Sequence, residues 1–205
     1  MNNLAYNSRD PENVGPKVEE IIRKEIGAAA PVPYTVTAGS PSPYTVGSMV
    51  KEMLVGGQTD LVFQLNFELP QPRPSRLQVS MDKMGVGCFA GTLLYSTKLS
   101  KWVRGEVALE PPKTFGKSKF TGDPEACAKL NANSGLVKLA NNFARTESKV
   151  GGGTLKRERL FKIVPDANGA VLLIASLPRT TSMGFSATVD SKDFFEIATM
   201  VEATL

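Results

Sequence analysis

The sequence TLKRERLFKIVPDANGAVLLIASLP, residues 154–178, consists of two strand-like runs joined by a short turn. The second run, 169–177, is almost wholly apolar, as expected for a core strand. The connecting PDANG, residues 165–169, contains an Asn-Gly pair that is typical of hairpin turns. The first run, 154–164, carries four cationic side chains: Lys156, Arg157, Arg159 and Lys162. We therefore predict a β-hairpin with one basic strand and one core strand.

Alternation of side chains along a strand divides these four cations between two faces. Lys156 and Lys162 share one face, whereas Arg157 and Arg159 share the other with Phe161. Both faces cannot be fully exposed. Either one face binds a ligand, or the two arginines lie near the end of the strand, beyond the core.

The rest of the sequence predicts an α+β protein. Strict alternation of apolar and polar residues over 61–69 is the strongest strand signal. Asp123 and Pro124 are typical of a helix N-cap and first helical position. Residues 135–147 fit either a helix or a strand. Other strands are expected at 75–81, 86–97, 101–110 and 183–189, and helices at 18–30, 125–130 and from 190 onward.

Two regions are expected along the chain. Residues 1–48 form an N-terminal tail with a short helix and a Pro/Ser/Gly-rich linker, and residues 49–205 form a single domain. No apolar run reaches the roughly 18–20 residues that a membrane helix needs, so no membrane partner is expected. The N-terminus shows no signal or transit peptide pattern.

Composition argues against the common catalytic machineries. The chain has no histidine, which removes Ser-His-Asp and Cys-His catalysis and any His-ligated metal. Cys88 and Cys127 have no CxxC spacing and are expected to be small buried hydrophobes. The glycine-rich stretch at 150–154 lacks a phosphate-loop pattern and is expected to be a flexible connection. We expect no enzyme activity, no metal and no cofactor.

Positive charge is concentrated in the middle of the chain. Residues 98–162 hold 14 Lys and Arg against 6 Asp and Glu, although the whole chain has a net charge of only +4. This excess either forms a basic surface for a polyanion or is spread over a solvated surface. Aromatic residues lie among these cations, and exposed aromatics can stack nucleic-acid bases.

The candidate nucleic-acid-binding residues follow from this interleaving. Cations can neutralise phosphates, with an affinity that falls as salt rises. The phosphate candidates are Lys98, Lys101, Arg104, Lys113, Lys117, Lys119, Lys156, Arg157, Arg159 and Lys162, followed by Arg76, Lys83 and Arg179. The stacking candidates are Tyr95 and Phe115, although Phe115 could instead anchor a loop. Trp102 is expected in the core rather than as a stacking platform.

Three segments resemble the Whirly proteins. SRLQVSMDKMGVGCFAGTLLYSTKLSKWVRGEVALEP, residues 75–111, resembles the central strands of that family. LKRERLFKIVPDANGAVLLIASLP, residues 155–178, resembles its later strand pair with a P-[DN]-A-[DN]-G turn, and 190–205 resembles its C-terminal helix. The plant members' lysine-glycine-lysine stretch is missing, because 56–70 reads GGQTDLVFQLNFELP. The resemblance is therefore closer to the kinetoplastid mitochondrial RNA-binding proteins.

This resemblance implies a fold and a function. The fold is two antiparallel four-stranded sheets packed crosswise, each followed by a helix. The function is non-catalytic binding of guide RNA through its phosphates on a basic sheet surface, promoting annealing to pre-mRNA during RNA editing in the mitochondrial matrix. The implied assembly is a heterotetramer with a related Whirly-fold subunit.

Several alternatives remain open from the sequence. The protein could be a single-stranded DNA-binding Whirly-type factor for transcription or genome maintenance, or a structural subunit of a larger assembly. The last helix has more apolar residues than one sheet needs, so it contacts either a second subunit or only its own chain. These apolar residues are Phe194, Phe195, Ile197, Met200, Val201 and Leu205.

Overall fold

The computed structural model describes residues 2–6, 10–37, 60–83, 89–111, 118–150, 153–176 and 185–205. Its helices are α1 (Pro11–Ile26), α3 (Pro124–Ala132), α4 (Ser134–Ala144) and α5 (Ser191–Thr204). Its strands are β1 (Asn2–Tyr6), β2 (Tyr34–Thr37), β3 (Asp60–Leu69), β4 (Ser75–Lys83), β5 (Phe89–Leu99), β6 (Val107–Glu110), β7 (Lys119–Gly122), β8 (Arg145–Val150), β9 (Gly153–Asp166), β10 (Gly169–Ser176) and β11 (Phe185–Val189).

One antiparallel sheet organises the molecule. Eight strands follow in the order β2-β3-β4-β5-β10-β9-β6-β7, β8 pairs with the first half of β9, and β1 pairs separately with β11. The predicted α+β class is confirmed. Over the described residues, the structure shows this main sheet and the separate β1–β11 pair, and it does not show two crosswise four-stranded sheets.

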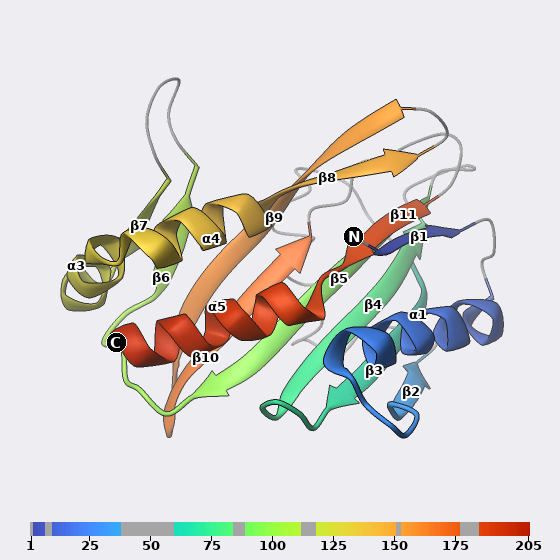
Figure 1. The fold of residues 1–205 in the computed structure, drawn as a ribbon, viewed down its shortest axis with the longest axis horizontal. Helices are drawn as coiled ribbons and strands as arrows, with labels where there is room; N and C mark the ends of the chain where they lie inside the picture. The colour runs from blue at the N-terminus through green and yellow to red at the C-terminus, as the bar shows by residue number, and fades with distance from the viewer. Residues whose placement is uncertain are drawn as a thin grey trace.

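The helices α1, α4 and α5 lie on the same face of the sheet (Figure 1). Alternate strand residues point toward them and form the core, as the pattern over 61–69 predicts: Phe63, Leu65, Phe67 and Leu69 are all buried. Helix α5 completes this core, because Phe194, Phe195, Ile197 and Val201 are buried within the chain itself. Their apolar character therefore gives no argument for a second subunit.

The predicted hairpin is formed by β9 and β10. Asp166 pairs with Gly169 across the turn, and β10 lies between β9 and β5. Gly169 has a φ of +145°, and a Cβ built there would lie 2.3 Å from the carbonyl oxygen of Leu99. Only glycine allows β5 to approach the turn this closely.

The N-terminal region differs from the prediction of a separate tail. Asp10 caps α1 by accepting a hydrogen bond from the Glu12 N–H at 3.0 Å, so the helix begins well before residue 18. Val14, Val18 and Ile22 belong to the same core as the sheet. Strand β2 lies in the predicted linker and pairs with β3. The boundary at 48/49 therefore does not separate these elements from the domain.

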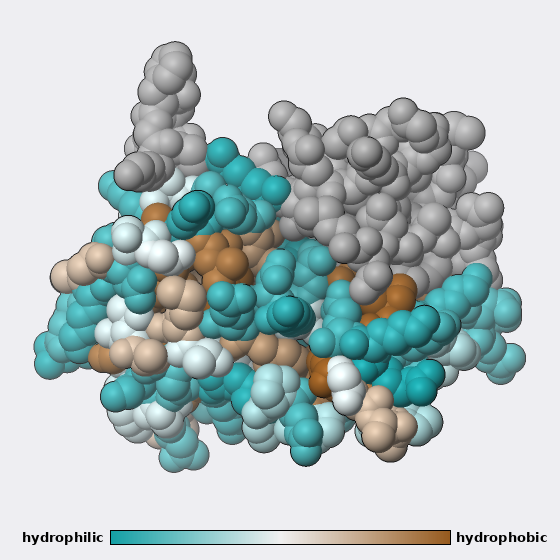
Figure 2. Space-filling view, viewed as in Figure 1, coloured by the Kyte–Doolittle hydropathy of each residue, from teal (hydrophilic) through white to brown (hydrophobic). Residues whose placement is uncertain are grey.

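The helix-bearing face is largely hydrophilic at its surface. Figure 2 shows polar side chains along α1 and apolar ones gathered over the region of α4 and α5. Among the described residues, the large hydrophobic side chains that are exposed are Val36 and Trp102. None of the described helices is long and apolar enough to span a bilayer.

Candidate nucleic-acid interface

A loop at residues 100–106 presents the sole tryptophan of the chain to solvent. Trp102 is 64% exposed, whereas its neighbour Val103 is buried and fixes the loop to the core. The predicted burial of Trp102 is wrong, and the strand predicted at 101–110 is formed over Val107–Glu110 but not over 101–106. The strand β6 begins only at Val107, since the backbone N–H groups before it are bound by a side chain.

Asp123 holds the C-terminal half of this loop. One carboxylate oxygen accepts the backbone N–H of Arg104 at 2.5 Å and that of Gly105 at 3.1 Å. The other oxygen caps α3 by accepting the N–H of Glu125 at 3.0 Å and of Ala126 at 3.1 Å, as the Asp-Pro pattern predicts. These backbone hydrogen bonds, with that of Ala126 foremost, lower the pKa of Asp123 against the opposing effect of burial.

Glu202 of α5 holds the N-terminal half. Its Oε1 accepts the backbone N–H of Ser100 at 2.7 Å and also the Ser100 hydroxyl. Its Oε2 accepts from Arg73 at 2.8 Å, and Arg73 also donates to the Lys98 carbonyl. Burial would raise the pKa of Glu202, but the hydrogen bonds from Arg73 and Ser100 outweigh it and leave the pKa lowered. The loop is thus fixed at both ends.

Three of the cations predicted as phosphate contacts lie close to Trp102 in the sequence, on either side of it. The side chains of Lys98 and Arg104 are 80% and 89% exposed, and Lys101 is also exposed. Lys98 lies 3.8 Å from Asp166, and Arg104 lies 3.8 Å from Glu125. Exposed pairs of this kind contribute about 0–1 kcal/mol, so both cations can exchange to a phosphate at little cost. Lys101 forms no ion pair with any described residue.

A second group of cations lies on the face of the sheet opposite the helices. Registered pairs place Arg76, Ser96, Leu173 and Lys162 in one row across β4, β5, β10 and β9. Arg76 pairs with Glu68 at 2.8 Å and Lys162 with Glu106 at 2.8 Å, so this row is close to neutral. Lys119 is exposed on β7 at the edge of the sheet.

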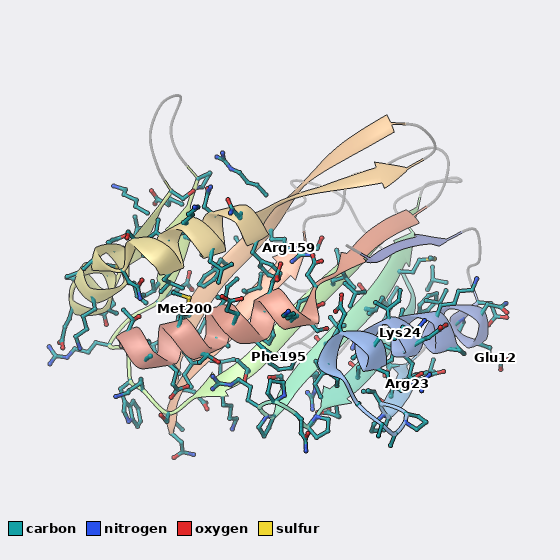
Figure 3. All side chains as sticks on the ribbon, viewed as in Figure 1. Glu12, Arg23, Lys24, Arg159, Phe195 and Met200 are labelled. Atoms are coloured by element: carbon teal, nitrogen blue, oxygen red, sulfur yellow. The ribbon has the colours of Figure 1, made fainter. Side chains whose placement is uncertain are left out.

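Arg159 is a correction to the predicted phosphate contacts. It lies on the helix side of β9, where its side chain is only 3% exposed. Its Nη2 donates to Asp190 at 2.7 Å, and its guanidinium lies 4.0 Å from the ring centroid of Phe143. Figure 3 shows it near the start of α5. The sequence did not show on which face of β9 the Arg159 side chain lies. In the structure it lies on the helix side and supports the core.

Tyr95 is a second correction, because it is buried and cannot stack a base. Its ring stacks on Phe194 with centroids 4.8 Å apart. Its hydroxyl accepts the backbone N–H of Asp190 at 3.0 Å and contacts the Ser191 hydroxyl at 3.4 Å. Burial, above all, raises its pKa. The phenol therefore stays protonated and acts as a structural hydrogen-bonding group.

Some predicted site residues lie outside the described part of the chain. These residues are Lys113, Phe115, Lys117 and Arg179. The described part of the chain also excludes Cys88 and residues 151–152 of the predicted glycine-rich connection. For Lys83, Lys156 and Arg157 the backbone belongs to β4 or β9, and the side chains are not described. Cys127 is buried, as predicted, and burial raises the pKa of its thiol.

Three residues of the loop's surroundings were not predicted as site residues: Lys129, Asp123 and Glu202. Lys129 lies one helical turn after Glu125, with its Nζ 3.4 Å from the carboxylate. That i,i+4 spacing was visible in the sequence. The contact of Glu202 with Ser100 spans 102 positions and leaves no local signal.

Comparison with protein-family models, curated proteins and solved structures finds no match to this chain. The geometry of the described residues therefore carries the functional argument.

Proposed function

We propose that the protein binds single-stranded nucleic acid without catalysing a reaction, and that this nucleic acid is RNA. The observation that carries the proposal is the exposed Trp102 on a loop fixed at both ends and flanked by Lys98, Lys101 and Arg104. An exposed aromatic surrounded by cations is how proteins stack unpaired bases while neutralising the adjoining phosphates.

The anchoring of the loop favours binding. A surface that is already ordered loses less conformational entropy when a ligand docks. Asp123 and Glu202 provide that order through backbone hydrogen bonds and the Ser100 hydroxyl, and these anchoring contacts do not use the side chains of Lys101, Trp102 and Arg104. Arg76 and Lys162 lie on the opposite sheet face as secondary candidates, which can bind a phosphate after exchange of their partners Glu68 and Glu106.

The sole tryptophan gives a direct assay. Single-stranded RNA is titrated into the protein at several salt concentrations while the fluorescence of Trp102 is recorded. We expect quenching on binding, an affinity that falls with salt, and a five- to 150-fold weaker affinity for Trp102→Ala, measured by anisotropy of labelled RNA, corresponding to roughly 1–3 kcal/mol per stacked base. Binding that is absent at moderate salt would favour the structural-subunit alternative.

A charge-matched pair of variants tests the cations. The variant Lys98→Ala/Lys101→Ala/Arg104→Ala should make the negative slope of log K against log[salt] shallower by about 0.7 per lost phosphate contact. The control removes three exposed lysines from the helices α1, α4 and α5: Lys17, Lys138 and Lys192. Equal losses in the two variants would mean that only net charge matters.

The more specific proposal concerns the RNA and the assembly. Guide-RNA binding and annealing by a Whirly-type protein, in a heterotetramer of the mitochondrial matrix, is supported by the sequence resemblance alone. Native mass with and without RNA measures the oligomer. Competition between RNA and DNA of identical sequence separates RNA binding from the single-stranded DNA alternative.

A further inference from the structure

A small hollow lies beside Trp102, between the loop and the start of α3. It has a volume of about 210 Å³, and its lining includes Trp102, Arg104, Glu125, Ala126 and Lys129. Pockets that enclose drug-sized ligands measure roughly 300–1,000 Å³, so this hollow suits a single ring system. It combines an aromatic surface with two cations and with carboxylates.

The interior of the hollow is poorly suited to a phosphate, although the Arg104 side chain, which is 89% exposed, can still contact a phosphate outside it. Asp123 also lines it, so two carboxylates oppose the two cations there. Phosphates are better received by Lys98 and Lys101 outside the hollow. The hollow instead offers hydrogen-bond acceptors and donors next to a ring surface, which is the pattern that reads the edge of an unpaired base.

Glu125 and Lys129 define what that edge must present. A carboxylate only accepts hydrogen bonds and an ammonium only donates them. Lys129 lies 3.4 Å from the Glu125 carboxylate and also donates to the carbonyl oxygen of Leu205 at 3.0 Å. The Glu125 side chain is 60% exposed, so its oxygens remain accessible to a ligand beside Lys129 and Arg104.

Guanine fits this arrangement. Its Watson–Crick edge carries two neighbouring donors, N1–H and the N2 amino group, beside the O6 acceptor. Adenine, cytosine and uracil each lack two adjacent donors on that edge. We propose that the hollow is a guanine-selective subsite: Trp102 stacks the base, Glu125 accepts from N1 and N2, and Lys129 donates to O6. This inference rests on the proposed single-strand binding and adds base selectivity to it.

The test uses the full chain and four seven-nucleotide RNAs that differ only at the central position of a uridine background. Anisotropy measures the affinities, and quenching of Trp102 reports stacking. We expect central guanosine to bind at least about fivefold more tightly than central adenosine, cytidine or uridine, as a bidentate base contact provides. Central inosine, which lacks the N2 amino group, should lose most of that preference in the unchanged protein.

Glu125→Gln isolates the carboxylate, with Glu196→Gln as the control that removes the same charge from an exposed site on α5. We expect Glu125→Gln to abolish the guanosine preference and Glu196→Gln to keep it. Equal binding of all four RNAs by the unchanged protein would overturn the subsite and leave the proposed function standing. A guanosine preference that survives in Glu125→Gln would overturn it as well. Failure of every RNA to bind would overturn both proposals.

Discussion

Arg159 of β9 and Asp190 at the start of α5 form a buried ion pair, with Nη2 and Oδ2 2.7 Å apart. The pair joins the sheet to the last helix. It also explains why the Asp190 side chain forms no cap hydrogen bond with α5, although it occupies the N-cap position.

Replacing one partner should destabilise the protein strongly. We expect Arg159→Ala to lower the free energy of unfolding by about 3–5 kcal/mol, because it leaves a buried carboxylate unpaired. Lys162→Ala, three residues along the same strand, breaks a more exposed pair with Glu106 and should cost no more than about 1 kcal/mol. Urea unfolding measures both. Similar losses would contradict the structural role of Arg159. Variants that probe RNA contacts on β9 should therefore keep this arginine.

Tyr95 and Trp102 should show opposite phenotypes. Tyr95→Phe removes the acceptor of the partly buried Asp190 N–H and should cost about 1–3 kcal/mol of stability without changing RNA affinity. Trp102→Ala removes an exposed side chain and should change stability by no more than about 0.5 kcal/mol while weakening RNA binding. Thermal unfolding and RNA titration are compared for the two variants. Loss of RNA affinity in folded Tyr95→Phe would restore Tyr95 as a contact residue.

Asp123 predicts a specific pH dependence. Its folded-state pKa is depressed, so its stabilising contribution is present above the unfolded value of about 3.9 and is lost as pH falls through the folded value. Asp123→Asn should be less stable than the unchanged protein at pH 7 by about 1–2 kcal/mol. The difference should shrink as pH falls through the folded value, because the native side chain is then itself neutralised. A difference that stays constant with falling pH in urea titrations would contradict this account.

Gly169 should not tolerate a side chain. Gly169→Ala brings a Cβ within 2.3 Å of the Leu99 carbonyl oxygen at a φ of +145°, and we expect a loss of more than about 1 kcal/mol in unfolding free energy. The matched control is Gly105→Ala, where nothing lies within 4 Å of the new Cβ. A stable Gly169→Ala protein would show that β5 and the hairpin turn can move apart.

Local patterns predicted much of the fold. The alternation over 61–69 corresponds to β3, and the Asp123–Pro124 pair begins α3 as expected. Residues 135–147 were ambiguous because they contain a helix followed by a strand. The loop at 100–106 escaped prediction, since Trp and Val favour strands locally and the opposing contact comes from Glu202, 102 residues later than Ser100.

Residue type and local position predicted part of the candidate site, but they did not show which side chains are buried. Lys98, Lys101 and Arg104 were chosen as cations in a basic segment, and they are exposed. Residue type alone could not show that Arg159 lies on the helix side of its strand. For Tyr95 a signal existed, because Leu93 and Leu99 share its strand face and both are core residues.

The anchoring of the Trp102 loop by Glu202 also affects the time at which the surface forms during synthesis. A chain elongated only to the end of β11 contains every residue of the loop but lacks the carboxylate that binds Ser100. Trp102 is then displayed on a segment that has the contacts of Asp123 and Val103 but lacks that of Glu202. The ordered loop therefore arises after α5 docks, so an incomplete or misfolded chain lacks the arrangement with which the finished protein is proposed to bind.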